Sequence, residues 1–325
     1  MIDTTLILID GLTGSGKSTT AQRLWLHLER CGVAARWIYE HDTSHPIWEA
    51  GELQCIFESG AVAPGFATRT LPMRWRRLAL HCAASGVRTI LESALLQSTV
   101  GLLLAMNADE REITSSILAC DHAVAGQRPV LVWFRPGDVA QALRAVCDDR
   151  CDSGYEAALI KLLAATPYGR DHGLADFAGL VRFYQRWSDL AESLCARLGM
   201  PVLALDAPGW PARERRIAEF LGLPPFDEPR VRIEAPSRFL GPFRDMGSDD
   251  RLVIAGGEDG LHLDDARHTR LIAHAGATFH IAALCAELSF EDERGGRFHR
   301  IGLRGNLPGL SPTWYRVEGE EEVRP

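Results

Sequence analysis

Short apolar runs alternate with helical patterns along the first two thirds of the sequence. Five such runs predict buried strands, at residues 5–10, 35–39, 88–91, 129–134 and 201–205. Apolar residues at helical spacing predict six helices, at residues 17–30, 71–84, 109–125, 138–148, 174–198 and 212–221. Parallel strands need helical crossovers, so this alternation predicts an α/β fold with a mainly parallel sheet flanked by helices.

The alternation of strand and helix patterns ends after residue 222, where prolines interrupt the helical pattern. They stand at Pro224, Pro225, Pro229, Pro236 and Pro242. Beyond them, short strand-like runs at 252–255, 284–290 and 298–303 are separated by Gly-rich and Asp-rich turns, and no long helix is predicted. We therefore predict two domains, residues 1–229 and a small β-rich domain over residues 230–325 whose role the sequence does not reveal.

Composition and charge narrow the classes of partner. The chain of 325 residues has a formal net charge of -8 with scattered basic residues, which argues against a nucleic-acid-binding surface. The longest apolar stretch, around residues 100–106, is too short to span a membrane, and no signal-peptide pattern opens the sequence. Eight cysteines without regular spacing are typical of reduced thiols. We expect a cytoplasmic protein without nucleic-acid or membrane partners.

Residues 11–18 satisfy the pattern G-x-x-x-x-G-K-[ST], between a predicted strand and a predicted helix. In such a P-loop the backbone N–H groups face the phosphates of a nucleotide, Lys17 adds a positive charge, and Ser18 can ligate Mg²⁺. We therefore predict that the protein binds ATP and Mg²⁺. The predicted nucleotide-binding residues are Gly11, Leu12, Thr13, Gly14, Ser15, Gly16, Lys17, Ser18 and Thr19.

The loop alone does not name the reaction, because P-loops serve switches, motors and kinases alike. The sequence contains no N-K-x-D guanine motif, no L-S-G-G-Q transporter signature and no strand ending in Asp-Glu. These absences argue against the GTPase, transporter and motor classes.

Residues 9–19, Ile-Asp-Gly-Leu-Thr-Gly-Ser-Gly-Lys-Ser-Thr, resemble the P-loop of the deoxynucleoside kinase and thymidylate kinase group within the P-loop kinase superfamily. Asp10 stands where that group has an acidic residue before the first glycine. The resemblance continues more faintly to about residue 222. It implies a kinase that transfers the γ-phosphoryl group of ATP to a hydroxyl or phosphate of a small acceptor, nucleoside-like, nucleotide-like or another metabolite.

The resemblance also implies catalytic roles for individual residues. Glu40 follows the second predicted strand, where those kinases have the base that acts on the acceptor hydroxyl. Glu92 ends the third predicted strand and matches the glutamate of a Glu-Arg-Ser motif, although the arginine is missing here. Glu92 would hold Mg²⁺ together with Ser18, and Lys17 would contact the phosphates. Arg144 and Arg150 stand where those kinases place arginines that close over the phosphates.

Several alternatives remain open from the sequence. Asp42 is the next choice for the base. Arg74, Arg76 and Arg77 could bind an anionic acceptor, but a solvated helix face is the commoner explanation of such a run. The alternative function is a P-loop ATPase that acts as a regulatory nucleotide-binding protein. The acceptor is not identified, and the oligomeric state is open, with a homodimer among the options.

Overall fold

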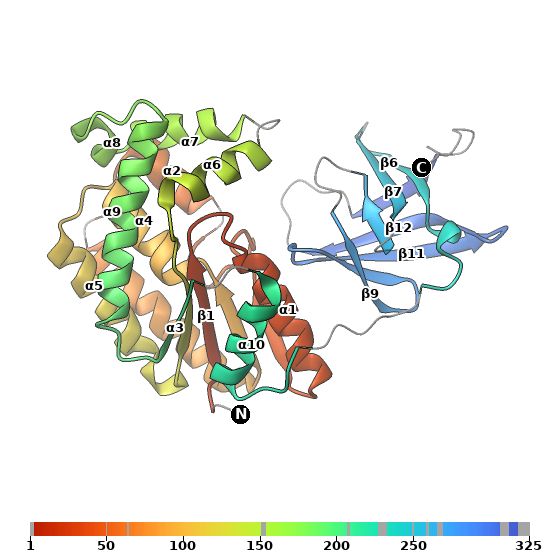
Figure 1. Ribbon diagram of the computed structural model, residues 1–325, viewed down its shortest axis with the longest axis horizontal. Helices are drawn as coiled ribbons and strands as arrows, with labels where there is room; N and C mark the ends of the chain where they lie inside the picture. The colour runs from red at the N-terminus through yellow and green to blue at the C-terminus, as the bar shows by residue number, and fades with distance from the viewer. Residues whose placement is uncertain are drawn as a thin grey trace. The chain divides into compact units, whose positions relative to one another are not determined.

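The computed structural model divides the chain into two compact units (Figure 1). Unit 1 comprises Met1–Glu40 and Ser44–Phe226, and unit 2 comprises His41–Thr43 and Asp227–Pro325. The predicted boundary between residues 229 and 230 lies outside the described residues. The structure describes residues 3–49, 51–63, 65–150, 154–206, 209–226, 233–248, 250–257, 260–264, 269–305 and 312–317.

Unit 1 is built on a parallel sheet of five strands, which confirms the α/β class. In spatial order the strands are β2 (Ala35–Ile38), β3 (Arg88–Glu92), β1 (Leu6–Gly11), β4 (Val130–Phe134) and β5 (Val202–Leu205). Each pair of neighbours is parallel, and Ile9 lies opposite Glu92 in the register of β1 and β3. The carboxyl ends of all five strands therefore meet at one edge of the sheet, which is where ligands bind in such folds.

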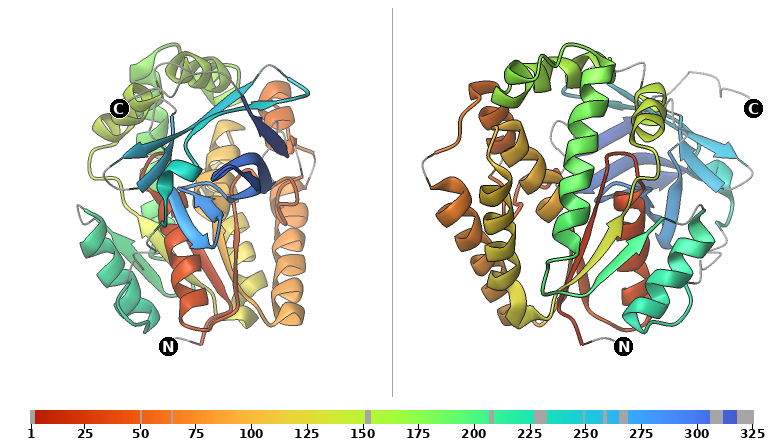
Figure 2. Two further views of the ribbon diagram at one scale, coloured as in Figure 1. Left: turned by 90° about the vertical axis from the view of Figure 1, so that its right-hand side faces the viewer. Right: turned by 60° about the vertical axis from the view of Figure 1, so that its left-hand side comes forward.

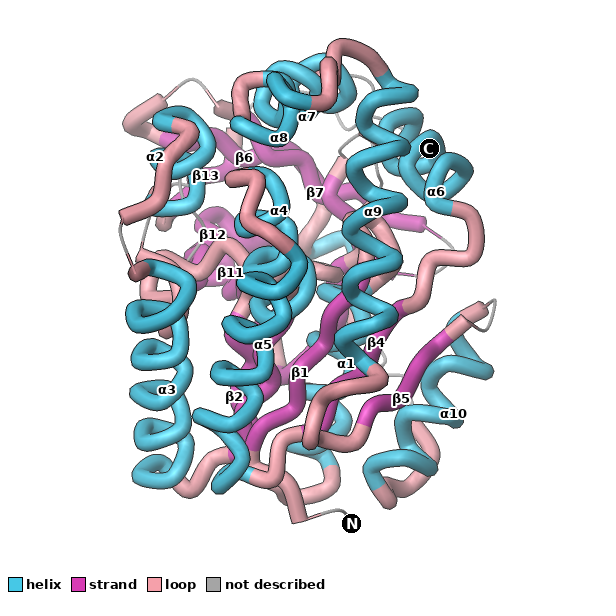
Figure 3. Tube along the Cα trace, turned by 90° about the vertical axis from the view of Figure 1, so that its left-hand side faces the viewer, coloured by secondary structure: helices cyan, strands magenta, loops and turns pink. Residues whose placement is uncertain are grey.

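Helices cover both faces of this sheet. Helices α3, α5 and α9 lie over one face (Figure 3), and α1 and α10 lie over the other (Figure 2). The helices of unit 1 are α1 (Lys17–Arg30), α2 (Glu52–Ser59), α3 (Leu71–Ser85), α4 (Gly101–Ala105), α5 (Glu110–Val124), α6 (Val139–Asp149), α7 (Tyr155–Ala164), α8 (Pro167–Asp171), α9 (Phe177–Cys195) and α10 (Trp210–Leu221). Within the described ranges, none of the helices is long and apolar enough to cross a membrane.

The central strand β1 explains why the sequence favours this layering. All six of its residues are buried. Leu6 and Leu8 belong to the core that includes residues of α3, α5 and α9, while Ile7 and Ile9 alternate with them and are equally buried. Since successive side chains of a strand point to opposite faces, β1 must be covered on both sides, as an uninterrupted apolar run predicts.

The connections of unit 1 contain structure that the sequence pattern did not reveal. Two π-helical segments, η1 (Phe66–Thr70) and η2 (Ala94–Val100), precede α3 and α4, and a 3₁₀ turn, η3 (Ala125–Gln127), follows α5. Helices α2, α4, α7 and α8 were not predicted either. The segment η2 begins directly after Ser93, at the carboxyl end of β3, so it continues from the edge where the five strands end.

Unit 2 is an antiparallel sheet of eight strands, more than the three predicted. They are β6 (Gly241–Asp245), β7 (Arg251–Gly257), β8 (Gly260–Leu263), β9 (Leu271–Ala275), β10 (Thr278–Ile281), β11 (Ala286–Arg294), β12 (Arg297–Gly305) and β13 (Thr313–Arg316), after a 3₁₀ turn, η5 (Pro236–Arg238). The sheet runs β8-β7-β6-β13-β12-β11-β10-β9, and a bridge between His262 and Arg270 joins its two ends into a near-barrel. Aromatic residues such as Phe243, Phe279 and Phe290 fill the interior.

The separate core of unit 1 leads to a prediction. A fragment of residues 1–226 should be soluble and unfold in one cooperative transition, because the core beneath α3, α5 and α9 contains no residue beyond 204. Phe226 stacks on His27 with ring centroids 4.4 Å apart, and His27 Nε2 lies 3.0 Å from the Pro224 carbonyl. A shorter fragment, 1–222, lacks both contacts and should melt at a lower temperature. Circular dichroism melts of the two fragments make the comparison, and an insoluble 1–226 fragment would contradict the prediction.

Candidate functional site

The loop of residues 11–18 connects β1 to α1 and adopts a conformation that requires glycine. Gly14 and Gly16 have φ values of +77° and +92°, which side chains rarely allow. A Cβ atom on Gly14 would lie 2.0 Å from Val146 Cγ2, and one on Gly16 would lie 2.8 Å from the Trp210 ring. The loop leads directly into Lys17, the first residue of α1, so the unsatisfied N–H groups of a helix N-terminus point into this region.

Lys17 is buried at the end of this loop, with 5% of its surface exposed. Its ammonium group donates a hydrogen bond of 2.9 Å to the Leu12 carbonyl. Burial lowers the pKa of Lys17, while the carboxylates of Glu40, Glu92 and Asp10 act in the opposite direction. Lys17 and three carboxyl groups therefore lie close together at the carboxyl ends of β1, β2 and β3.

Glu92 is the most deeply buried of these groups. Its Oε1 accepts a hydrogen bond of 3.0 Å from the Ser18 hydroxyl and one of 3.4 Å from the backbone N–H of Glu40. Its Oε2 is buried and has no hydrogen-bond partner among the described residues. Burial, reinforced by the Glu40 charge, raises the pKa of Glu92 to about 8. Near neutral pH the ionised form of Glu92 is therefore disfavoured, and stabilising it would take more positive charge than Lys17 supplies.

Glu40 is held in place by a residue that sequence analysis missed. Gln97 donates a 2.8 Å hydrogen bond from its side-chain amide to Glu40 Oε1. Gln97 belongs to η2, a π-helical segment for which the sequence offers no recognised signal. The Glu40 carboxylate therefore has a defined position beside Glu92, although β2 itself ends two residues earlier, at Ile38.

Asp10 fixes the start of η2. Its carboxylate accepts three backbone N–H groups, from Leu95 at 3.1 Å, Leu96 at 3.2 Å and Gln97 at 2.8 Å. Burial raises the pKa of Asp10 to about 6, although these hydrogen bonds and Lys17 act against the shift. Asp10 thus connects the strand before the glycine loop with the segment that carries Gln97.

The two predicted arginines occupy different surroundings. Arg150 lies near enough to Lys17 for its charge to lower the pKa of the ammonium group, and its guanidinium carbon lies 4.8 Å from the Tyr155 ring centroid. Arg144 instead pairs with Glu156 at 2.7 Å and lies 3.7 Å from the Phe177 ring centroid. The structure brings Arg150 to the candidate site and leaves Arg144 bracing α6 against α7 and α9.

A cavity of about 530 Å³ borders the glycine loop. It is lined by loop residues 12–15, by residues of α6 and the segment before it, and by Arg213 of α10. Arg213 donates a 3.1 Å hydrogen bond to the Ser15 carbonyl, and its guanidinium carbon lies 5.2 Å from the Phe134 ring centroid. Arg135 and Arg150 also line this cavity, so three guanidinium groups border it. The cavity is large enough for a small ligand, and its three guanidinium groups outnumber the one carboxylate that lines it, Asp149, which favours an anionic ligand.

The basic group on α3 lies beside the segment that follows β2. Arg74 pairs with Glu52 at 2.5 Å and donates a 2.8 Å hydrogen bond to the Ile47 carbonyl, while Trp75 is buried in the core. Arg76 and Arg77 are exposed. The solvated helix face is therefore the better interpretation of this run.

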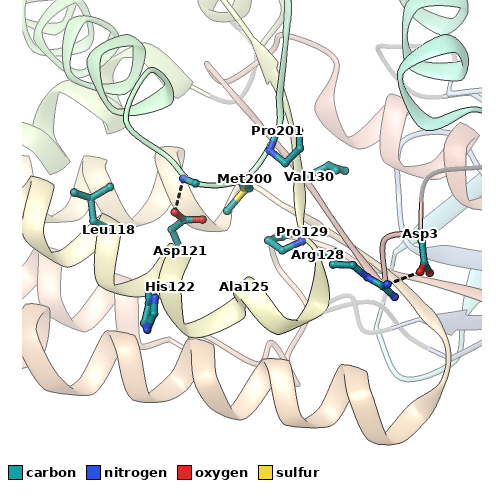
Figure 4. Close-up of a pocket in the computed structure, with 11 residues that line it drawn as sticks. Asp3, Leu118, Asp121, His122, Ala125, Arg128, Pro129, Val130, Met200 and Pro201 are labelled. Atoms are coloured by element: carbon teal, nitrogen blue, oxygen red, sulfur yellow. Dashed lines mark hydrogen bonds and ion pairs between the residues drawn. The ribbon is translucent and has the colours of Figure 1, made fainter.

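A second cavity, of about 670 Å³, lies at the opposite edge of the sheet (Figure 4). Val130 begins β4, and Pro201 directly precedes β5, so this cavity borders the amino ends of the strands. The Asp121 carboxylate there accepts the Gly199 N–H at 2.7 Å, and Arg128 pairs with Asp3. Its charged groups thus have partners within the protein, and the cavity is separate from the group around Glu92.

Comparison with known proteins does not assign a family. The sequence matches no protein-family model, and no curated protein is significantly similar to it. The class that the fold and the site define is therefore a two-unit α/β protein with a glycine-rich loop and a buried carboxylate cluster at the carboxyl edge of its parallel sheet.

The raised pKa of Glu92 predicts a pH-dependent stability. Between its unfolded pKa of about 4.5 and its folded pKa of about 8, folded Glu92 binds a proton that the unfolded chain releases, so stability falls as pH rises through this window. Glu92→Gln should remove this loss and raise the melting temperature at pH 8.5 by several degrees relative to the parent. The effect is measured as the melting temperature of each protein between pH 5 and 8.5, in the presence of a metal chelator. The exposed Glu112→Gln serves as the control, and equal pH profiles for the parent and Glu92→Gln would contradict the assignment.

Proposed function

We propose that the protein is an ATP-dependent phosphotransferase and that residues 11–18 are a phosphate-binding P-loop. The observation that carries the proposal is the convergence of Lys17, Ser18 and Glu92 beside a loop whose glycines cannot be replaced without a clash. The sequence resemblance to the deoxynucleoside kinase and thymidylate kinase group supports the same class. The acceptor is a small molecule with a hydroxyl or phosphate group.

The nucleotide phosphates would bind at the N-terminus of α1. The loop offers backbone N–H groups there, and anions are stabilised at a helix N-terminus. Lys17 would exchange its hydrogen bond with the Leu12 carbonyl for one to phosphate oxygens, a better partner for a buried ammonium group. The cavity bordered by Arg135, Arg150 and Arg213 would accept another part of the nucleotide.

Ser18 and Glu92 fit a magnesium ion. The Ser18 hydroxyl and the Glu92 carboxylate are oxygen ligands 3.0 Å apart, and Glu92 Oε2 is a buried oxygen without a partner among the described residues. Bound there, Mg²⁺ would neutralise phosphate charge and lower the pKa of Glu92 by its own charge. The raised pKa of Glu92 supports this site, because it shows that the protein groups around the carboxyl do not themselves neutralise its charged form.

Glu40 is the best placed base for an acceptor hydroxyl. Gln97 fixes one carboxylate oxygen at 2.8 Å, which limits the rotation of the side chain. From this position Glu40 would take the hydroxyl proton as the hydroxyl oxygen bonds to the γ-phosphorus, while the bond between that phosphorus and the β,γ-bridging oxygen breaks and ADP leaves. Lys17 and Arg150 would stabilise the negative charge of the transferring group. Most of the catalysis would come from positioning and charge, since phosphoryl transfer needs little covalent chemistry from the protein.

One experiment tests the proposal and its alternative together. The protein is incubated with ATP, Mg²⁺ and pooled nucleosides and metabolites, and new phosphorylated compounds are identified by mass. We expect an acceptor-dependent loss of ATP, and Lys17→Ala should reduce it about 100-fold or more because the phosphate contact is lost. Circular dichroism controls for folding. Slow ATP hydrolysis without any phosphorylated product would favour the regulatory ATPase, and full activity in folded Lys17→Ala would overturn the P-loop assignment.

Substitution of Glu92 and substitution of Glu40 should impair different reactions. Glu92→Gln removes a charged ligand from the magnesium site, so it should weaken both transfer and background hydrolysis and raise the magnesium concentration needed for half-maximal rate. Glu40→Gln removes the base and should reduce transfer to the acceptor by about 100-fold or more, much more than hydrolysis. Both rates are measured across a magnesium titration. If Glu40→Gln transfers phosphate at the parental rate, Asp42 becomes the next residue to test.

A further inference from the structure

We propose that unit 2 binds one divalent transition-metal ion through His274, His280 and Glu287. These residues come from three neighbouring strands, β9, β10 and β11. Each offers one ligand atom, and the three ligand atoms lie within 4.8 Å of one another. The proposal concerns a different part of the chain from the phosphotransferase site and does not depend on it.

The strand register explains why the three side chains meet. His280 lies directly opposite Glu287 in the antiparallel pair of β10 and β11. Phe279 and Ile281 flank His280 and belong to the core of unit 2, so His280 points to the outer face of its strand, where its side chain is still buried with 4% of its surface exposed.

The neighbours of the other two residues place them on the same outer face. Ala286 and Leu288 are core residues on either side of Glu287, and Leu271 and Ala273 contribute to the core from β9. A register shift between Thr278 and Phe279 offsets the end of β9, and the His274 and His280 rings approach to 4.6 Å between centroids.

The donor set identifies the class of ion. Two imidazole nitrogens and one carboxylate oxygen suit Zn²⁺, Fe²⁺, Co²⁺ or Ni²⁺, whereas Mg²⁺ and Ca²⁺ prefer oxygen ligands. Metal bonds of about 2.0–2.2 Å require ligand atoms to lie about 3–3.5 Å apart, so small side-chain rotations would close the site. Three protein ligands leave at least one position for water or another ligand, as in exchangeable zinc sites.

The cluster also stands out within the chain. Among the residues that the structure describes, it is the one group of three His, Cys, Asp or Glu residues whose ligand atoms come this close. Two of its members are histidines on the strands of a sheet, where the backbone fixes their spacing. This rigidity favours metal binding, because fewer side chains have to be ordered when the ion binds. A surface group of carboxylates would not have it.

The test uses the full chain, treated with a chelator and titrated with Co²⁺ and separately with Zn²⁺. We expect one equivalent of Co²⁺ to bind, with visible absorption bands typical of nitrogen and oxygen ligation, and we expect Zn²⁺ to displace it. His280→Ala should abolish these bands, and Glu287→Gln, which keeps the size of the side chain, should weaken binding at least 10-fold.

Two control variants make the outcome specific. His299→Ala removes a histidine from β12 of the same unit, and Glu92→Gln removes the carboxylate proposed to bind magnesium; both should bind Co²⁺ as the parent does. Circular dichroism verifies folding of every variant. Binding that is not saturable at one equivalent, or that persists unchanged in folded His280→Ala and Glu287→Gln, would overturn the proposal. Loss of Co²⁺ binding in Glu92→Gln alone would assign the ion to unit 1 and would also overturn it.

Discussion

The burial of Glu92 is the constraint on which the site in unit 1 depends. The carboxyl group at the end of β3 is buried, and among the described residues only Ser18 and one backbone N–H donate hydrogen bonds to it. An unsatisfied buried oxygen is costly, and a fold keeps such a group only when something else is gained. A cation between Ser18 and Glu92 would compensate for that cost, and for this reason the buried Glu92 oxygen supports the proposed magnesium site.

Asp10 extends this constraint to the rest of the site. Its carboxylate sits between the last residues of β1 and the first N–H groups of η2, and it therefore sets where η2 begins. Through η2 it places Gln97, and through Gln97 it places Glu40. The acidic residue that precedes the glycine loop thus works as a structural anchor for the proposed base. It accepts backbone N–H groups, and no phosphate contact is needed to explain its position.

The sequence predicted those features that local patterns encode. The five parallel strands follow from uninterrupted apolar runs, and the position of Glu92 follows from its place directly after one of them. The glycine loop could be predicted because the turn it makes fixes the spacing of its glycines.

Gln97 and Arg213 were not predicted because each reaches the site from a segment distant in the sequence. Gln97 comes from a π-helical segment and Arg213 from α10, and neither has a local sequence signature. Arg144 was predicted from its place after β4, but the helix face it occupies turns it toward Glu156. In unit 2, the strands are short and their apolar residues alternate with partly buried ones, which gives weak patterns, so five of eight were not recognised.

The two proposed metal sites differ in a way that follows from their strands. In unit 1 the sheet is parallel and buried on both faces, so polar ligands collect at its edges, and at the carboxyl edge Ser18 of α1 and Glu92 of β3 supply hydroxyl and carboxylate oxygens. In unit 2 the sheet is antiparallel with one face outside its core, so side chains on adjacent strands can meet in the middle of that face. The first arrangement provides hard oxygen ligands and suits Mg²⁺, while the second provides imidazoles and suits a transition metal. Each unit would therefore select its ion by donor chemistry, and the two ions need not compete even when both are present.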